Sequence, residues 1–375
     1  MSQNVFAPWD DPNAKPLIRF QNVTKRFGEF VAIDDLTLDI FEQEFFALLG
    51  PSGCGKTTMM RMLAGFENIS AGRIELSGQD IGKVPPNKRA VNMMFQSYAL
   101  FPHLSVWENI AFGLKRDRKS KEQIDARVAE MLKLTRLEKF AHRKPHQISG
   151  GQRQRVALAR SLAKAPKLLL LDEPLGALDK KLRQDTQFEL MDIQEQTGTT
   201  FVIVTHDQEE AMTVASRVAV MDEGRIIQVA TPSAIYEYPN SVYVADFIGD
   251  VNIIEGKAKP AGEELFHLEW AEGRAPVKAA SQQPFSEGQT AHLAIRPEKI
   301  RISTEKPEEA VNLFEGKVLD IAYLGNLSTY HVELPSGQVI KAQTANTRRL
   351  ARRDITWEDP VWISWSATAG VMLDR

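Results

Sequence analysis

A run of eight residues near the start of the chain has the composition needed to hold phosphate. Its glycines would let backbone amides wrap around phosphate groups, and the run matches the phosphate-loop pattern in full. The Lys56 ammonium can reach the β- and γ-phosphates of ATP, and the Thr57 hydroxyl can ligate Mg²⁺, an ion that takes few protein ligands. Cys54 fits better as a small filler than as a nucleophile, because no chemistry here needs a thiol. The predicted nucleotide-binding residues are Gly50, Pro51, Ser52, Gly53, Cys54, Gly55, Lys56, Thr57 and Thr58.

A second candidate anion site lies much further along the chain. Ser149 can cap the helix that follows it, and the exposed amides of that helix would then face an anion. The two glycines that come next allow a ligand to approach the backbone closely. Two anion sites so far apart in the sequence indicate that one ATP is held between two surfaces. The candidate residues of this second site are Ser149, Gly150, Gly151 and Gln152.

Acidic and histidine side chains follow two apolar strands. Asp172 and Glu173 come directly after the apolar run 167–171, and His206 follows the apolar run 201–205. Carboxylates at the carboxyl ends of strands lie where open α/β sheets bind ligands. We expect Asp172 to hold Mg²⁺ and Glu173 to polarise the attacking water. The alternatives are an acid pair that makes local caps and a structural histidine, but the buried strands before these residues favour a functional role.

The elements that must position these residues belong to an α/β fold. Strands are predicted over 17–28, 31–40 and 44–49 and a helix over 57–65, so the phosphate loop has its required strand–loop–helix context. The two apolar runs predict strands of a parallel sheet that is buried on both faces. A mostly helical stretch is expected before these two runs, at about 97–164. After residue 239, alternating segments predict a small all-β, barrel-like domain, at 292–296, 314–323, 328–334, 338–342 and 361–365.

Composition is that of an ordinary soluble globular protein. The 375 residues suffice for two or three domains, 43% of them are hydrophobic, and a net charge of −3 does not call for a nucleic-acid partner. No stretch of ~20 apolar residues would span a membrane, and residues 1–15 lack the pattern of a signal peptide. Cys54 is the only cysteine, which excludes an intrachain disulfide. We therefore expect a cytosolic chain that reaches a membrane only through a partner.

Residues 17–249 resemble the ATP-binding subunit of an ABC transporter, because the motifs of that family appear in order. Besides the stretches above, Met94-Phe95-Gln96-Ser97 matches the glutamine loop, Ala177-Leu178-Asp179 matches the dimer loop, and His206 matches the switch histidine. Phe27 matches the aromatic residue that stacks on adenine, although a lone aromatic is usually part of a core. Ile148 stands where the family usually has leucine, a change that keeps volume.

The resemblance implies a mechanism in which two copies of the chain face each other head to tail. One copy would hold ATP and Mg²⁺, while Ser149 and Gly151 of the other copy cap the γ-phosphate. ATP binding would close the pair and hydrolysis would reopen it, a population shift driven by differential affinity for the closed state. The implied roles are catalysis for Glu173, His206 and Gln96, metal binding for Thr57, Gln96 and Asp172, and dimer contact for Asp179.

The tail resembles the OB-like (TOBE) regulatory β-domain of importer ATPases, through Ala294-Ile295-Arg296-Pro297-Glu298 and Ala322-Tyr323-Leu324-Gly325. This implies a P-loop NTPase ABC cassette over 17–248, with the helical subdomain inside it, followed by a regulatory domain over 249–375. Over the full length, the closest resemblance is to the ATPases of bacterial putrescine or spermidine importers. Asn92-Met93-Met94-Phe95-Gln96 and residues 321–330 weigh most in that assignment.

The family implies an ABC-type translocase ATPase that couples ATP hydrolysis to polyamine uptake at the cytoplasmic face of the inner membrane. Its partners would be a second copy, two membrane-spanning permease subunits and, indirectly, a periplasmic solute-binding protein. The apolar segment 98–103 is either core of the helical subdomain or a groove for a permease helix. The alternatives are an importer of another solute, such as a sugar or ferric iron, and a DNA-repair or translation ATPase. The latter usually has a long coiled coil, zinc cysteines or tandem cassettes, which this sequence lacks.

Overall fold

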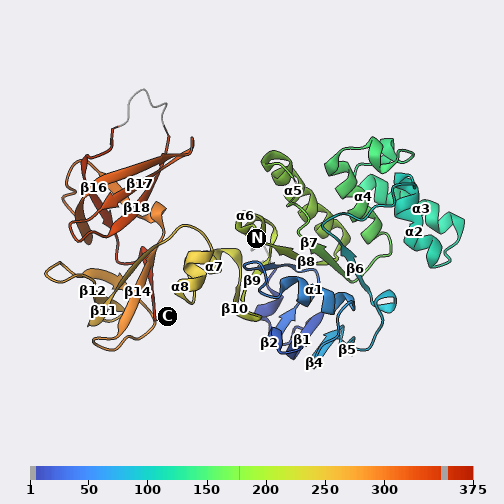
Figure 1. The fold of residues 1–375 in the computed structure, drawn as a ribbon, viewed down its shortest axis with the longest axis horizontal. Helices are drawn as coiled ribbons and strands as arrows, with labels where there is room; N and C mark the ends of the chain where they lie inside the picture. The colour runs from blue at the N-terminus through green and yellow to red at the C-terminus, as the bar shows by residue number, and fades with distance from the viewer. Residues whose placement is uncertain (1–5, 177, 348–353, 375) are drawn as a thin grey trace. The chain divides into compact units, whose positions relative to one another are not determined.

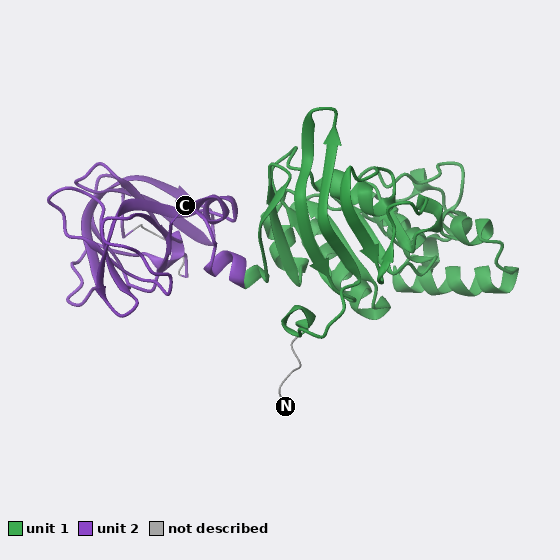
Figure 2. Cartoon of the chain, turned by 90° about the horizontal axis from the view of Figure 1, so that it is seen from below, with its two compact units in different colours: residues 1–233 green, residues 234–375 purple. Residues whose placement is uncertain are grey.

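The computed structural model describes residues 6–176, 178–347 and 354–374. It divides the chain into two compact units, residues 1–233 and residues 234–375 (Figure 2). The sequence-based boundary between residues 248 and 249 stays a prediction. No helix in the described ranges is both long enough and apolar enough to cross a membrane.

A six-stranded sheet forms the centre of the first unit (Figure 1). Its central strands are fully buried over most of their length, because the sheet is covered on both faces, as their apolar sequences predicted. The parallel pairing of β3, β7 and β8 brings their carboxyl ends to one edge. The strand order is β10 (Arg225–Ala230), β9 (Arg217–Asp222), β3 (Phe45–Leu49), β8 (Thr200–Thr205), β7 (Leu168–Asp172) and β6 (Val91–Met94), with β10 antiparallel to β9.

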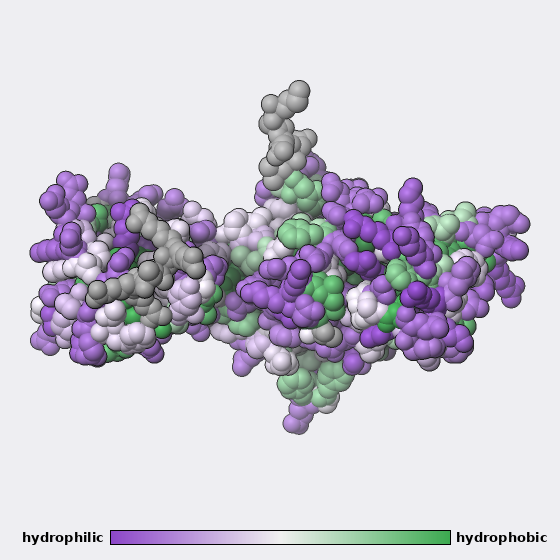
Figure 3. Space-filling model, turned by 90° about the horizontal axis from the view of Figure 1, so that it is seen from above, coloured by the Kyte–Doolittle hydropathy of each residue, from purple (hydrophilic) through white to green (hydrophobic). Residues whose placement is uncertain are grey.

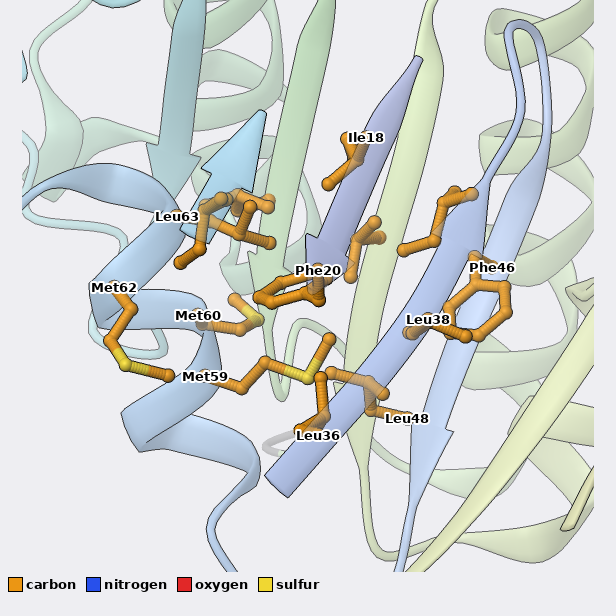
Figure 4. Packing of buried hydrophobic residues seen from close by; sticks show 14 of the residues in the cluster. Ile18, Phe20, Leu36, Leu38, Phe46, Leu48, Met59, Met60, Met62 and Leu63 are labelled. Atoms are coloured by element: carbon orange, nitrogen blue, oxygen red, sulfur yellow. The ribbon is translucent and has the colours of Figure 1, made fainter. Parts of the chain in front are cut away.

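A second, antiparallel sheet belongs to the same unit, and helix α1 (Lys56–Ala64) packs with it. Its order is β2 (Phe30–Ile40), β1 (Ile18–Phe27), β4 (Ala71–Leu76) and β5 (Gln79–Asp80). Figure 4 shows Met59 and Met60 of α1 beside Phe20 of β1 and Leu36 of β2, all of them buried. This cluster joins α1 to both sheets, so the start of the helix is held firmly beside the phosphate loop.

Helices form the remainder of the first unit, and most of them begin at a residue whose side chain caps the helix. Ser105, Ser120 and Ser149 each close a reciprocal capping box with the third helical residue, and Asp179 and Asp207 accept a hydrogen bond from the third residue of their helices. Short polar side chains thus fix where the helices start. The helices are α2 (Val106–Arg116), α3 (Lys121–Leu134), α4 (Gly150–Leu162), α5 (Lys180–Thr197) and α6 (Gln208–Val214).

The hairpin of β1 and β2 projects from the unit and exposes Phe27 and Phe30 beside its turn. Figure 3 shows hydrophobic surface gathered on this projection. The turn itself needs Gly28, whose φ of +60° lies in the left-handed region.

The second unit consists of two five-stranded antiparallel sheets around one apolar core. One has the order β13 (Val277–Ala280), β12 (Leu265–Glu269), β11 (Asn252–Gly262), β14 (Thr290–Ile295) and β20 (Gly370–Leu373); the other has the order β15 (Arg301–Ser303), β19 (Pro360–Trp365), β16 (Asn312–Tyr323), β17 (Leu327–Glu333) and β18 (Val339–Ala345). The prediction of an all-β domain is therefore confirmed. Two short helices precede these strands, α7 (Pro232–Glu237) and α8 (Val242–Phe247).

Arg296, which lies just after β14, ties the short helices to the β-domain. It is 4% exposed, and its guanidinium donates hydrogen bonds to the carbonyls of Ala245, Gly249 and Asp250. Its plane lies over the ring of Tyr236, 4.3 Å from the ring centre. The resemblance motif at residues 294–298 thus has a structural role, which is to satisfy the carbonyls at the end of α8.

Candidate functional site

The phosphate loop connects β3 to α1, and its glycines are required by its surroundings. A Cβ on Gly50 would lie 2.3 Å from the Met221 carbonyl oxygen, and one on Gly55 would lie 2.6 Å from the Ala32 carbonyl oxygen. Gly55 also has a φ of +107°, which other residues rarely adopt. The loop therefore packs closely against β9 and β2, which leaves no room for a side chain at Gly50 or Gly55.

Lys56 is buried and lies across this loop. Its ammonium donates hydrogen bonds to the Gly50 carbonyl at 2.7 Å and to the Pro51 carbonyl at 2.8 Å. The Cys54 sulfur lies 3.6 Å from the same nitrogen and is buried, which suits the filler role expected of it. Two carbonyls thus fix a positive charge at the loop, where a polyphosphate would bind.

Three predicted catalytic side chains meet at Glu173. Its Oε2 accepts a hydrogen bond of 2.9 Å from Gln96 Nε2, and its Oε1 lies 3.1 Å from His206 Nδ1. These residues follow β6, β7 and β8, so the parallel sheet brings them together at its carboxyl edge. Glu173 has a φ of +44°, a strained value for a non-glycine residue, and its amide is held by the Val204 carbonyl at 2.9 Å. Strand β7 ends at Asp172, so this left-handed backbone comes directly after the strand.

Asp172 lies one residue earlier, at the end of β7, and is half-buried. Burial, followed by the neighbouring Glu173 carboxylate, raises the pKa of Asp172, while Arg61 and Lys56 oppose the rise. Two adjacent carboxylates form a place that favours a cation. Together with the Thr57 hydroxyl and the Gln96 amide oxygen, Asp172 offers the oxygen ligands that Mg²⁺ prefers.

Ser149 caps α4, as its position predicted. Its hydroxyl accepts a hydrogen bond from the Gln152 amide at 3.2 Å, and its own amide donates to Gln152 Oε1 at 2.9 Å. A Cβ on Gly150 or Gly151 would meet no atom closer than 3.5 Å, so packing within the chain does not require glycine at either position. Glycine there leaves room for a ligand from outside. Among the described residues, the hydrogen bonds of Ser149 and Gln152 are local, and none joins them to the phosphate loop.

The positions of Phe27 and Asp179 suit their predicted roles, which stay predictions. The Phe27 ring is 46% exposed, and the Lys25 ammonium lies 4.5 Å from its centre on one side. Asp179 Oδ1 accepts the Leu182 amide at 3.0 Å and so caps α5. Ala177, the first residue of the predicted dimer loop, lies outside the described residues.

Sequence reasoning missed the side chains behind His206. Arg183 pairs with Asp207 at 2.5 Å, and the Thr205 hydroxyl donates to Glu210 at 2.5 Å. Burial raises the pKa of Glu210 to about 7. The only sequence signal was the spacing of Arg183 from Asp179, one helical turn, which places both at the same end of α5.

Comparisons with known proteins agree with this geometry. Residues 33–176 match the family described as ABC transporter, and residues 293–373 match the TOBE domain. The chain is 53% identical to the putrescine transport ATP-binding protein PotG of Escherichia coli, over 96% of this chain and 95% of that protein. It is 46% identical to the spermidine/putrescine import ATP-binding protein PotA of Protochlamydia amoebophila, over 96% of each chain.

Solved structures of ABC transporter cassettes match more than half of this chain. The cassette MJ0796, in a dimeric structure bound to ADP and Pi, is 32% identical with a TM-score of 0.51, and the match covers 57% of this chain and 98% of that one. The subunit cbiO1 of Clostridium perfringens, part of an ABC transporter complex, is 29% identical with a TM-score of 0.56 over 59% of this chain and 90% of that one.

Proposed function

Because this chain belongs to the family of ABC transporter ATP-binding proteins, we infer that it hydrolyses ATP to drive the import of putrescine or spermidine. The hydrolytic part rests on the Glu173 carboxylate, which lies between Gln96 and His206 at the strand edge that also carries the phosphate loop. A carboxylate so placed can accept a proton from an attacking water. The polyamine part is supported by the identity to polyamine-transport relatives along nearly the whole chain, β-domain included.

The nucleotide would bind with its phosphates on the loop of Lys56 and its adenine against Phe27. Mg²⁺ would be held by Thr57, Asp172 and Gln96, and when bound it would neutralise charge on the phosphates. The Glu173 carboxylate would take the proton of the water, and the His206 ring would steady that carboxylate and reach the γ-phosphate.

A second copy of the chain would complete the site through Ser149 and the amides of Gly150 and Gly151. A Cβ at either glycine would make no more than ordinary van der Waals contact within the chain, so glycine is not needed for internal packing there. This supports the proposal, because glycine lets a phosphate on the partner copy approach the backbone closely. The matching solved structures of the cassette MJ0796 are dimeric, which also supports a second copy. Asp179 would then face the partner.

Two permease subunits would dock beside the glutamine loop, which would place the chain at the cytoplasmic face of the inner membrane. Exposed aromatic rings lie there: Phe95 contacts Phe66 at 6.1 Å between ring centres, and Phe112 contacts Phe101 at 4.4 Å. Phe66, Phe95 and Phe112 are each more than one-third exposed. Exposed apolar rings of this kind can receive the apolar face of a short amphipathic helix.

The experiment that tests this function combines hydrolysis with uptake. The purified chain should release phosphate from ATP in the presence of Mg²⁺, and it should restore radiolabelled putrescine uptake in a strain that lacks its gene. Glu173→Gln should restore neither activity. Restored uptake of maltose or ferric iron without any effect on putrescine or spermidine would replace the polyamine assignment while keeping the ATPase.

A further inference from the structure

An ion pair outside the nucleotide contacts joins the dimer loop to the loop of His206. We propose that Arg183 and Asp207, here called the loop clamp, position His206 against Glu173 according to the placement of the dimer loop. The inference rests on the proposed function, because it takes His206 to act in ATP hydrolysis.

The Arg183 guanidinium bridges two loops that are distant in sequence. Its Nη1 donates to Asp207 Oδ2 at 2.5 Å, and its Nη2 donates to the Leu178 carbonyl of the dimer loop at 3.2 Å. Leu178 directly precedes Asp179, the residue that caps α5. A displacement of the dimer loop would therefore pull on the guanidinium and, through it, on Asp207.

Asp207 follows His206 directly, and the residues on both sides of the histidine are fixed. The Asp207 amide donates to Thr205 Oγ1 at 2.9 Å, and Asp207 Oδ1 accepts the Glu210 amide at 3.1 Å. Thr205 in turn donates to the carboxylate of Glu210, which is 2% exposed. His206 itself is 62% exposed at its side chain and meets Glu173 at 3.1 Å. Its placement is thus set by its neighbours rather than by packing of the ring.

Stability alone gives a weak reason for the loop clamp. The two side chains are only 30% and 24% exposed, so the free energy of desolvating their charges offsets much of their attraction. Arg183 Nε is buried without a hydrogen-bond partner among the described atoms, which costs free energy. The contact of 3.1 Å between His206 Nδ1 and Glu173 Oε1 is also sensitive to small movements, because a shift of roughly 1 Å takes the two atoms beyond hydrogen-bond reach. The geometry is therefore better explained if the loop clamp sets the distance between His206 and Glu173.

A double-mutant cycle on the full-length chain tests this role. Asp207→Asn keeps a capping oxygen for α6 but removes the charge that Arg183 binds. We expect kcat for ATP to fall about tenfold with KM for ATP changed less than about twofold, because positioning rather than binding is lost. In a His206→Ala background, measured by single-turnover release of labelled phosphate, the same change should alter the rate less than about twofold.

Glu189→Gln is the matched control. Glu189 also lies on α5 and pairs with an arginine, Arg155, at 2.5 Å with similar exposure, but it lies outside the loops of the site. Its change should leave kcat within about twofold. Arg183→Met removes the same ion pair from the other side, so it should also lower the rate in the parent chain but not in the His206→Ala background. Agreement between the two variants would exclude a folding defect of Asp207→Asn as the cause. If the parent chain hydrolyses ATP, two results would overturn this inference and leave the proposed function intact. One is an equal loss of rate from Asp207→Asn with and without His206→Ala, and the other is no loss of rate from Asp207→Asn. A parent without ATP hydrolysis would overturn the proposed function as well.

Discussion

Replacing Glu173 with glutamine separates the chemistry of the site from its architecture. Glu173 Oε2 accepts from the Gln96 amide and Oε1 lies beside His206 Nδ1. The glutamine amide can keep both contacts: its oxygen still accepts from Gln96, and its NH₂ can donate to Nδ1 when the His206 proton is on Nε2. The substitution therefore removes the ability to accept a proton from water and leaves the hydrogen-bond network in place.

The expected magnitudes follow from that difference. Because both contacts survive and the side chain is partly exposed, the free energy of unfolding should change by less than about 0.5 kcal/mol. A positioned general base contributes roughly 10²–10⁴-fold, so kcat should fall by that factor, or about 3–5 kcal/mol in the barrier. The Kd for ATP should stay within about threefold, because Lys56 and its loop are untouched.

Three assays on the same protein samples check these values: phosphate release under saturating Mg²⁺-ATP, equilibrium titration of ATP, and urea unfolding. Glu189→Gln serves as the control for loss of a carboxylate elsewhere in the cassette, and it should keep full turnover. Turnover of Glu173→Gln within about threefold of the parent would show that Glu173 is not the base. A large loss of stability would show that the contacts to Gln96 and His206 are not replaced as reasoned.

Three further predictions concern pH, the β-domain and adenine. Burial raises the pKa of Glu210 to about 7 from an ordinary value of 4.5, so the folded chain retains a proton that the unfolded chain releases. The free energy of unfolding should therefore fall as pH rises from about 4.5 to 7 and remain lower by roughly 3 kcal/mol above that. Glu210→Gln should remove this dependence in urea midpoints taken at pH 5 and pH 8. Arg296→Met should destabilise the second unit by about 3 kcal/mol in denaturant unfolding, because several carbonyls lose a charged donor; a change under about 0.5 kcal/mol would contradict the role given to Arg296. Phe27→Ala should weaken ATP binding about fivefold through loss of roughly 1 kcal/mol of stacking, whereas Phe30→Ala should not; equal effects of the two changes would remove Phe27 from the site.

The main parts of the candidate site could be predicted from the sequence because each depends on a local pattern. The apolar runs before Asp172 and His206 identify buried parallel strands, and such strands present their ends at one edge. Ser149 could be identified as a cap because its partner, Gln152, lies at the third helical position. In these cases a few consecutive residues carry the whole signal.

The rest of the structure depends on packing that no local pattern shows. The pairing of Arg183 with Asp207 requires α5 to lie against α6, and neither residue belongs to a motif that predicts a partner. Strands β11, β12 and β13 could not be placed, since β11 carries Gly256, Pro260 and Gly262, residues that weaken a strand pattern. Close packing explains Gly256: a Cβ there would lie 2.6 Å from the Glu269 carbonyl oxygen.

The proposed mechanism depends most on residues 149–152 of one copy, which would complete the ATP site of another copy. The direct measurement is the mass of the Glu173→Gln chain by light scattering on a sizing column, with and without ATP and with Ser149→Arg added. Ser120→Arg is the control, because Ser120 closes the same kind of capping box on α3. We predict ATP-dependent dimers for Glu173→Gln alone and with Ser120→Arg, and monomers that still bind ATP with Ser149→Arg. ATP-dependent dimers in the presence of Ser149→Arg would contradict the shared site.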